Sequence, residues 1–256
     1  MNSVQDQVRA YWDARPCGST EVSGELGSVD FLVAHARMRY GREPMIEPFA
    51  DFAGWAGRRI LEVGVGMGAD HLRFLKGRAE AVGIDLSPHS LKMTSLRAKA
   101  EGVRVSLVNA DAERLPFPDN SFDMAYSWGV LGHVRGAHHA TREIHRVLKP
   151  AGELRIMLYN RHSLNALQLY LYYGLLRGKP LAKVASLAEQ HLESPGTKVY
   201  APKEAKELLH EFADVQVKPA VTAYDLRFGR RRFAPRWMLR LIPDRLGRFL
   251  LIRAHK

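Results

Sequence analysis

The feature that most constrains the fold is an apolar run that ends in three glycines at alternate positions. It reads Ile60-Leu61-Glu62-Val63-Gly64-Val65-Gly66-Met67-Gly68. The apolar part is typical of a buried strand, and residues 69–76 after the glycines have the pattern of a helix. Because glycine has no Cβ atom, a ligand can lie close to the backbone of such a loop. The pattern predicts a strand, a loop and a helix that together hold a ligand.

An acidic residue follows the next apolar run. Residues 81–84 lead into Asp85, which lies 21 residues beyond Gly64. In a βαβ unit, an acid at the tip of the second strand can accept hydrogen bonds from both hydroxyls of a ribose. We therefore expect a ligand that contains a nucleoside. The spacing of Gly64, Gly66 and Ala69 also fits a dinucleotide fingerprint, and a purely structural turn is the remaining alternative.

Strand-like and helix-like segments alternate between residues 58 and 160. Five apolar runs are separated by helical stretches at 68–76, 88–101 and 137–148. This alternation predicts an α/β fold with a mostly parallel sheet covered by helices on both faces, and ligands bind at the carboxyl ends of such strands. The candidate binding residues fall at these ends, at 64–68, 85, 111 and 127–129.

Two further motifs accompany the glycine loop. Residues 109–123 read Asn-Ala-Asp-Ala-Glu-Arg-Leu-Pro-Phe-Pro-Asp-Asn-Ser-Phe-Asp, and residues 143–150 read Glu-Ile-His-Arg-Val-Leu-Lys-Pro. With the glycine loop, they closely resemble the class I S-adenosylmethionine (SAM) dependent methyltransferases, and most of all the small-molecule enzymes of the ubiquinone/menaquinone and natural-product type. The resemblance covers residues 55–160, with Ala151 standing where the family usually has a second glycine. It implies a Rossmann-like, mostly parallel seven-stranded sheet, an N-terminal helical cover and a helical lid.

The resemblance also implies roles for the residues at the strand ends. Glu62 would order the glycine loop and the amino group of SAM, and Asp85 would bind the ribose hydroxyls. Leu86 would pack on the adenine, Asp111 would accept from its exocyclic amine, and residues 127–129 would line the side where the methyl group is transferred. The implied SAM-binding set is Tyr11, Arg39, Glu62, Gly64, Val65, Gly66, Gly68, Asp85, Leu86, Asp111, Ala112, Glu113, Ser127 and Trp128.

Two members of this set come from the segment before the glycine loop. Residues 2–13 have apolar residues at helical spacing, among them Tyr11 and Trp12. A Tyr-Trp pair of this kind is common over the cofactor in similar enzymes; the alternative is that the pair is the buried face of the helix. Residues 29–40 are also helix-like, and Arg39 could bind the carboxylate of the methionine part, because a guanidinium binds a carboxylate at two points.

One histidine stands where a base for proton transfer would act. His133 lies just past the fourth strand, where similar enzymes often have a histidine close to the substrate. An imidazole with the ordinary pKa of about 6.5 accepts a proton near neutral pH. His133 is therefore the candidate catalytic base, and a structural histidine that caps the loop is the alternative. Other histidines lie nearby, but no carboxylate completes a ligand spacing, so we expect no metal site.

The chain is expected to form one α/β domain with additions. We divide it into an N-terminal helical cover (1–55), a SAM-binding core (56–160), a helical lid insertion (161–200) and a C-terminal part of the sheet with a basic segment (201–256). The lid is inferred because 40 residues exceed what a connection between strands needs. The alternative for this insertion is a packing or dimer element.

Composition and charge restrict the partners. The hydrophobic fraction of 46% and the charged fraction of 25% are ordinary for a soluble protein, and no apolar run approaches the ~18 residues of a membrane span. A single cysteine and an N-terminus unlike a secretory signal predict a cytoplasmic protein. Of the net charge of +11, residues 227–256 carry +9. This Arg-rich segment could contact a nucleic acid, an anionic membrane surface or an acidic acceptor, or be a solvated face.

These patterns predict a cytoplasmic SAM-dependent methyltransferase that acts on an oxygen or nitrogen of a small molecule of the natural-product or isoprenoid type. Two alternatives stay open: an RNA or peptide methyltransferase that uses the Arg-rich segment, and a non-catalytic SAM-binding protein. A nucleic-acid target is less favoured. Enzymes that methylate the exocyclic amines of bases carry Asn or Asp followed by Pro-Pro and an aromatic residue, whereas residues 127–129 read Ser-Trp-Gly.

Overall fold

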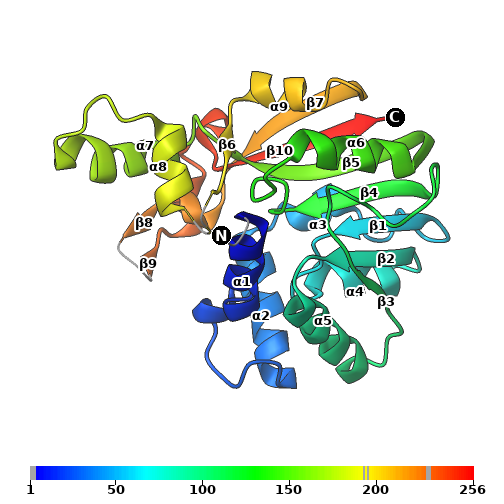
Figure 1. Ribbon diagram of the computed structural model, residues 1–256. Helices are drawn as coiled ribbons and strands as arrows, with labels where there is room; N and C mark the ends of the chain where they lie inside the picture. Colours follow the sequence, from blue (N-terminus) through cyan, green and yellow to red (C-terminus); the bar gives the residue numbers. More distant parts are fainter. Residues whose placement is uncertain (1–3, 193, 195, 229–231) are drawn as a thin grey trace.

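A central sheet organises the molecule, seen in a computed structural model that describes residues 4–192, 194, 196–228 and 232–256 (Figure 1). The strand order is β3-β2-β1-β4-β5-β10-β7, and a short strand, β6, also pairs with β5. Strands β1 to β5 pair in parallel, whereas β10 runs antiparallel to both β5 and β7. The strands are β1 (Arg59–Val63), β2 (Glu80–Asp85), β3 (Ser106–Asn109), β4 (Phe122–Trp128), β5 (Leu148–Asn160), β6 (Val199–Tyr200), β7 (Ala213–Ala220) and β10 (Phe249–His255). The predicted Rossmann-like, mostly parallel sheet is confirmed.

Helices cover both faces of this sheet, and each face has its own core. Successive side chains of a strand point to opposite faces, so Leu61 packs in a cluster with α6 (Ala137–Val147) and α9 (Pro202–Leu208). The neighbouring Ile60 packs in a second cluster, with α3 (Ile46–Ala50) and α4 (Ala69–Lys76). A further helix, α5 (Pro88–Ala100), follows β2. This layering places the loops after the parallel strands at one edge of the sheet.

The N-terminal helices lie at that edge. Helix α1 (Val4–Ala14) and helix α2 (Val29–Arg42), blue in Figure 1, both contact α5. The predicted first helix began at residue 2, and residues 2 and 3 lie outside the described residues. A short 3-10 turn, η1 (Ser19–Glu21), connects the two helices.

The segment predicted as a lid leaves the sheet between β5 and β6 and projects from the body of the molecule (Figure 1). It begins with α7 (Leu164–Leu169) and continues through a π-helical turn, η2 (Tyr170–Gly174), and a 3-10 turn, η3 (Leu175–Arg177). Helix α8 (Val184–His191) returns toward the sheet. The first part of the predicted helical insertion thus has three helix types in succession. The four-part division of the chain stays a prediction.

The C-terminal segment is more irregular than predicted. Between β7 and β10 it forms η4 (Ala223–Asp225), β8 (Arg227–Phe228), β9 (Arg232–Phe233), α10 (Arg236–Leu239) and η5 (Asp244–Leu246). Two arginines of the Arg-rich segment, Arg230 and Arg231, lie outside the described part of the chain. Among the described residues, no helix has both the length and the apolar character needed to span a bilayer.

One buried carboxylate ties the N-terminal cover to the sheet. Asp70, in the first turn of α4, accepts two hydrogen bonds from Arg39 of α2, at 3.2 and 2.6 Å. It also accepts from the hydroxyls of Tyr40 and Tyr126, at 2.9 and 3.0 Å. Burial alone would raise the pKa of Asp70, but Arg39 and these hydrogen bonds hold it below its usual value. A carboxylate also suits the positive end of a helix dipole.

We predict that Asp70→Ala lowers the free energy of unfolding by about 3–5 kcal/mol, because it removes the main partner of a largely buried guanidinium. The Arg39 side chain is only 17% exposed. Urea unfolding followed by circular dichroism measures the change. The matched control is Asp119→Ala, which breaks an ion pair to Arg146 whose carboxylate is 67% exposed, and should cost less than about 1 kcal/mol. Equal losses in the two variants would contradict this account of Asp70.

Candidate active site

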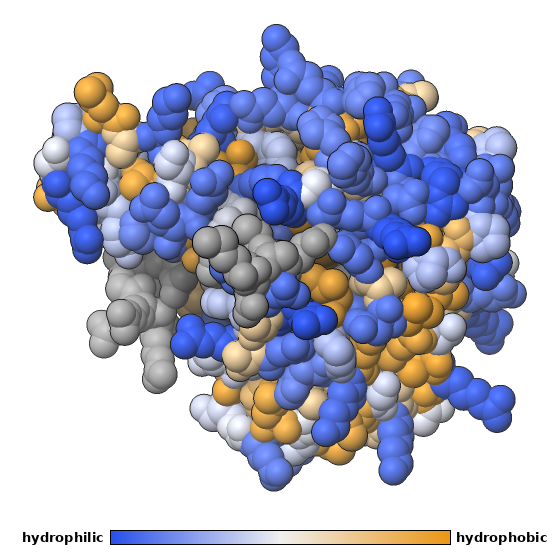
Figure 2. Space-filling view, viewed as in Figure 1, coloured by the Kyte–Doolittle hydropathy of each residue, from blue (hydrophilic) through white to orange (hydrophobic). Residues whose placement is uncertain are grey.

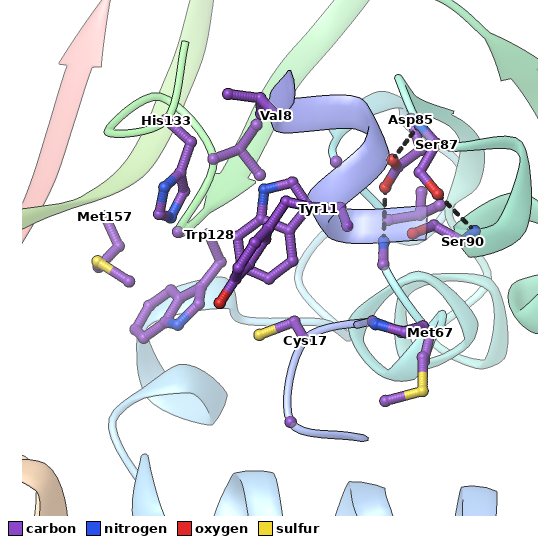
Figure 3. A pocket seen from close by; sticks show the side chains of 18 of the residues that line it. Val8, Tyr11, Cys17, Met67, Asp85, Ser87, Ser90, Trp128, His133 and Met157 are labelled. Atoms are coloured by element: carbon purple, nitrogen blue, oxygen red, sulfur yellow. Dashed lines mark hydrogen bonds between the residues drawn. The ribbon is translucent and has the colours of Figure 1, made fainter. Parts of the chain in front are cut away.

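A cavity of about 600 Å³ lies at the carboxyl ends of the parallel strands. Figure 3 shows its two ends, with Asp85 and Ser87 at one and Trp128 and His133 at the other. Every residue of the predicted site lines this cavity except Gly68 and Ser127. The structure therefore brings together side chains that come from α1, α2 and the loops after four strands.

The glycine loop has one side open to this cavity. A Cβ atom at Gly64 would lie 2.2 Å from the side chain of Val130, and one at Gly68 would lie 2.7 Å from that of Thr94, so these two positions are closed by packing. A Cβ atom at Gly66 would meet nothing within 4 Å. Gly66 has φ +53°, in the left-handed region that favours glycine. The room beside Gly66 fits the close approach of a ligand to the backbone.

Asp85 connects the second strand to this loop. Its carboxylate accepts hydrogen bonds from the backbone N–H groups of Gly66 and Ser87, both at 2.9 Å. Burial raises the pKa of Asp85 to about 6; those hydrogen bonds oppose the rise, and the carboxylate of Asp13 adds to it. The Ser87 hydroxyl donates to Asp13 of α1. Asp85 thus lies under the N-terminal helix with acceptor capacity directed at the cavity.

Glu62 lies at the wall of the cavity but already has a protein partner. Its carboxylate is 3.0 Å from Nδ1 of His71 in α4, and both residues are buried. Burial raises the pKa of Glu62 to about 7, although His71 acts in the opposite direction. The arrangement fits the predicted ordering role, because Glu62 joins the end of β1 to the helix that follows the glycine loop.

Like Glu62, Arg39 lines the cavity and is also bound to another side chain of the protein. It lines the cavity as predicted, yet its guanidinium is bound at two points by Asp70 and lies 3.8 Å from Glu43. A ligand carboxylate at this place would share the guanidinium with Asp70. Glu43 in turn accepts a hydrogen bond of 2.9 Å from the indole of Trp128.

The loop after β3 forms the side predicted to meet the adenine. The Asp111 carboxylate accepts from the N–H of Glu113 at 2.9 Å. The Glu113 carboxylate accepts from the N–H of Gly136 at 2.9 Å, just before α6. Leu86 and Ala112 complete this part of the wall. Asp111 therefore orders its own loop, and Glu113 ties that loop to the start of α6, while both acids also line the cavity.

The opposite end of the cavity is an aromatic chamber. His133 lies between Trp12 and Tyr159, with ring centroids at 5.2 and 5.7 Å. Trp128 and Phe249 meet edge to face at 5.8 Å in the same wall. Ser127 lies behind this wall, where its hydroxyl donates to the carbonyl of Val63.

His133 is held by two hydroxyl residues that the sequence did not indicate. Its Nδ1 atom is 2.8 Å from the Ser194 hydroxyl and 3.1 Å from that of Thr197. The Thr197 hydroxyl donates to the Ser194 carbonyl at 2.6 Å, so toward His133 it acts as an acceptor. A proton on Nδ1 fits this pair and leaves Nε2 as the basic atom. No sequence signal links these residues, since more than 60 positions separate them from His133.

Arg248 is a second residue of the chamber that sequence reasoning missed. It is 6% exposed, and its guanidinium lies 5.4 Å from the ring centre of Tyr159 and 5.3 Å from that of Tyr224. Within the described residues, no group of three His, Cys, Asp or Glu side chains is arranged to hold a metal ion.

Comparison with known proteins agrees with this geometry. A family model described as "Methyltransferase domain" matches residues 61–156. A demethylmenaquinone methyltransferase of Geobacillus kaustophilus is 34% identical over 166 residues, which are 59% of this chain and 69% of the relative. A ubiquinone/menaquinone biosynthesis C-methyltransferase of Dinoroseobacter shibae is 32% identical over 173 residues, covering 65% and 68%.

Solved structures share the fold at lower identity. A phospholethanolamine N-methyltransferase of Haemonchus contortus, in complex with S-adenosylhomocysteine, is 18% identical with a TM-score of 0.66 over 97% of this chain and 60% of its own. The PH0226 protein from Pyrococcus horikoshii is 16% identical with a TM-score of 0.62, over 96% and 98%. The [4+2]-cyclase SpnF is 20% identical with a TM-score of 0.61, over 99% and 96%. These likenesses show the fold alone.

The fold and the motifs at its strand ends define a class I SAM-dependent methyltransferase. Within that class, the chain belongs to the family of the ubiquinone/menaquinone methyltransferases. It is an enzyme whose cofactor is SAM, as the resemblance implied.

We propose that the cavity holds SAM with its ribose at Asp85, its methionyl part along Gly66 and its adenine between Leu86 and the loop after β3. The open side of Gly66 and the buried acceptor beside it support this placement. Bound there, SAM supplies a methyl group carried on a positively charged sulfur, directed toward the aromatic chamber.

We predict that SAM affinity falls as the pH is lowered through about 6. The ribose hydroxyls donate to the ionised form of Asp85, and below its folded-state pKa of about 6 that form must first be generated. Binding should weaken by up to about tenfold per pH unit below pH 6. Calorimetric titration across this range measures the change.

The variant Asp85→Ala should lose about 1.5–3 kcal/mol of binding free energy at neutral pH, because hydrogen bonds to a charged acceptor disappear. Its remaining affinity should no longer follow the titration near pH 6, whereas Asp119→Ala should behave as wild type. Unchanged binding in Asp85→Ala would remove the ribose assignment.

Proposed function

We propose that this enzyme methylates a hydroxylated aromatic ring of the quinol type. The observation that carries the proposal is the aromatic chamber, which holds one histidine in the same cavity as the open glycine loop. A flat ring packs well against aromatic side chains at offset or edge-to-face geometry. The names of the relatives point the same way, since both act on quinone precursors by name.

The lid segment supplies an apolar extension to the chamber. Leu169 of α7, Tyr173 of the π-helical turn and Leu192 after α8 reach its wall. Tyr173 stacks on His191 at 3.9 Å between ring centres. An isoprenoid substituent on the ring would find apolar contacts along this side, which is why we favour an acceptor with such a tail.

The protein has two tasks in this reaction. It must align the acceptor with the methyl group and exclude water, because the departing thioether is neutral and needs no acid. It must also remove a proton from the acceptor, since an ionised ring hydroxyl makes the ring carbon beside it, or its own oxygen, nucleophilic. We assign the proton removal to Nε2 of His133, with Ser194 and Thr197 holding the imidazole through Nδ1.

The position of methylation is the finer part of the proposal. The sequence predicted transfer to oxygen or nitrogen, whereas the name of one relative specifies transfer to carbon. We propose carbon beside the ionised hydroxyl. The new C–C bond forms as the S–CH3 bond breaks; the ring proton at that carbon then leaves and the oxygen takes up a proton again, so that one base can serve both proton transfers. Mass spectrometry after acetylation of the free hydroxyls distinguishes the two, because a C-methylated quinol takes up two acetyl groups and an O-methylated quinol only one.

The test is incubation with labelled SAM and a panel of short-chain quinols, amines and RNA. Transfer to quinols alone supports the proposal. Transfer to RNA, or SAM binding without transfer to any acceptor, would overturn it in favour of the alternatives. We also propose that the acceptor is a small molecule and that the enzyme is cytoplasmic. The single cysteine supports the cytoplasmic location.

We predict that His133→Ala lowers kcat for a quinol by about 10²–10⁴-fold, the usual contribution of a positioned base. SAM affinity should stay within a few-fold, because His133 lies at the acceptor end. The control is His138→Ala, an exposed histidine on the outer side of α6, which should keep wild-type activity. A His133→Ala rate within a few-fold of wild type at every pH would remove His133 as the base.

A further inference from the structure

The outer end of the lid exposes an unusual number of large apolar side chains. We call residues 167–183 the lid tip. Half of the large hydrophobic residues that are exposed among the described residues lie here: Leu167 (50%), Leu171 (39%), Tyr172 (64%), Leu175 (48%), Leu176 (73%) and Leu181 (94%). The projecting lid carries these orange side chains at the upper left of Figure 2.

These side chains do not belong to the acceptor chamber. The chamber takes Leu169 and Tyr173 from the same helical stretch, so that stretch has an inner and an outer face. The tip is also ordered: the Tyr170 hydroxyl donates to the Pro180 carbonyl at 2.8 Å, and the N–H of Lys179 donates to the Gly174 carbonyl at 2.9 Å. The exposed leucines therefore lie on the outer face of a segment that internal hydrogen bonds hold in a defined conformation.

The charges within the lid tip have one sign, and the first acid after it is Glu189, near the end of α8. Arg177, Lys179 and Lys183 are exposed, and the sequence has no Asp or Glu between residues 154 and 188. A second exposed apolar pair, Trp237 and Leu241, lies in the Arg-rich segment, on or just after α10. Helix α10 and the lid helix α7 both contact η4, so the two cationic, apolar elements are neighbours.

We propose that the lid tip docks the enzyme on the anionic surface of a lipid bilayer. Exposed leucines and a tyrosine in a segment whose only charges are cationic are the composition of an element that inserts shallowly between lipid headgroups. Because the other face of the same helical stretch lines the chamber, docking would bring this wall of the chamber close to the membrane. Delivery of an acceptor with an isoprenoid tail from the bilayer then rests on the function proposed above.

A second copy of the chain fits the tip less well. In a symmetric dimer the same patch faces itself, so Arg177, Lys179 and Lys183 of both copies would be brought together without an acid from this segment. In a bilayer that contains anionic lipid, the hydrocarbon region can bury the leucines, and the negatively charged headgroups can bind the Arg and Lys side chains.

The test is flotation of the whole enzyme with vesicles of phosphatidylglycerol and phosphatidylcholine, compared with vesicles of phosphatidylcholine alone. We expect binding to the mixed vesicles that weakens with salt, and at least about tenfold weaker partitioning for Leu176→Ser/Leu181→Ser. The matched control is Val29→Ser/Val33→Ser, two exposed valines (56% and 48%) of α2, away from the lid in Figure 1. This control should bind as wild type.

Failure to bind the mixed vesicles, equal binding by the lid variant, or a dimer that depends on Leu176 and Leu181 in sedimentation would each overturn the docking. A second readout separates docking from the quinol proposal. The lid variant should methylate a water-soluble short-chain quinol at the wild-type rate, but a long-chain quinol in vesicles at least about tenfold more slowly. If vesicle binding depends on the lid and no quinol is methylated, the function fails while the docking stands.

Discussion

The fold depends on a carboxylate that four hydrogen bonds hold in the interior. Asp70 begins α4 directly behind the glycine loop, and its partners come from α2 and β4. An ion pair buried in this way repays its desolvation only when its hydrogen-bonding capacity is used, and here both oxygens are used. The helix that follows the glycine loop, the sheet centre and the N-terminal cover are thereby fixed relative to one another, and the cofactor cavity is the space that they enclose.

The gathering of the proposed cofactor residues at one cavity could be predicted because the information for it is local. Gly64, Gly66 and Asp85 each lie at the end of a strand whose apolar run is visible in the sequence. In a parallel sheet the carboxyl ends of all strands lie at one edge, so no information about distant contacts is needed to bring these residues together. The helices at 69–76, 88–100 and 137–147 matched their predicted ranges within a residue or two for the same reason.

The acceptor side could not be predicted because distant segments build it. Nothing in the sequence joins His133 to Ser194 and Thr197, or brings Arg248 beside Tyr159. Two-residue strands such as β6 form through tertiary pairing and leave no periodicity to detect. The π-helical turn at 170–174 likewise keeps an ordinary helical composition. Arg39 was placed at the cavity, but its partner Asp70 is 31 positions away and was not foreseen.

The three glycines of the loop serve two different purposes: two of them allow the protein to pack, and one leaves space for a ligand. Gly64 and Gly68 are required by neighbouring side chains, whereas the room beside Gly66 belongs to no other part of the protein. A methyl group at 66 would therefore cost the chain little beyond an unfavourable left-handed backbone, yet it would occupy the space that we propose for SAM. A single added carbon atom at position 66 could therefore block ligand binding without disturbing the fold. A related protein with a side chain at this position could keep the same structure and no longer bind the ligand.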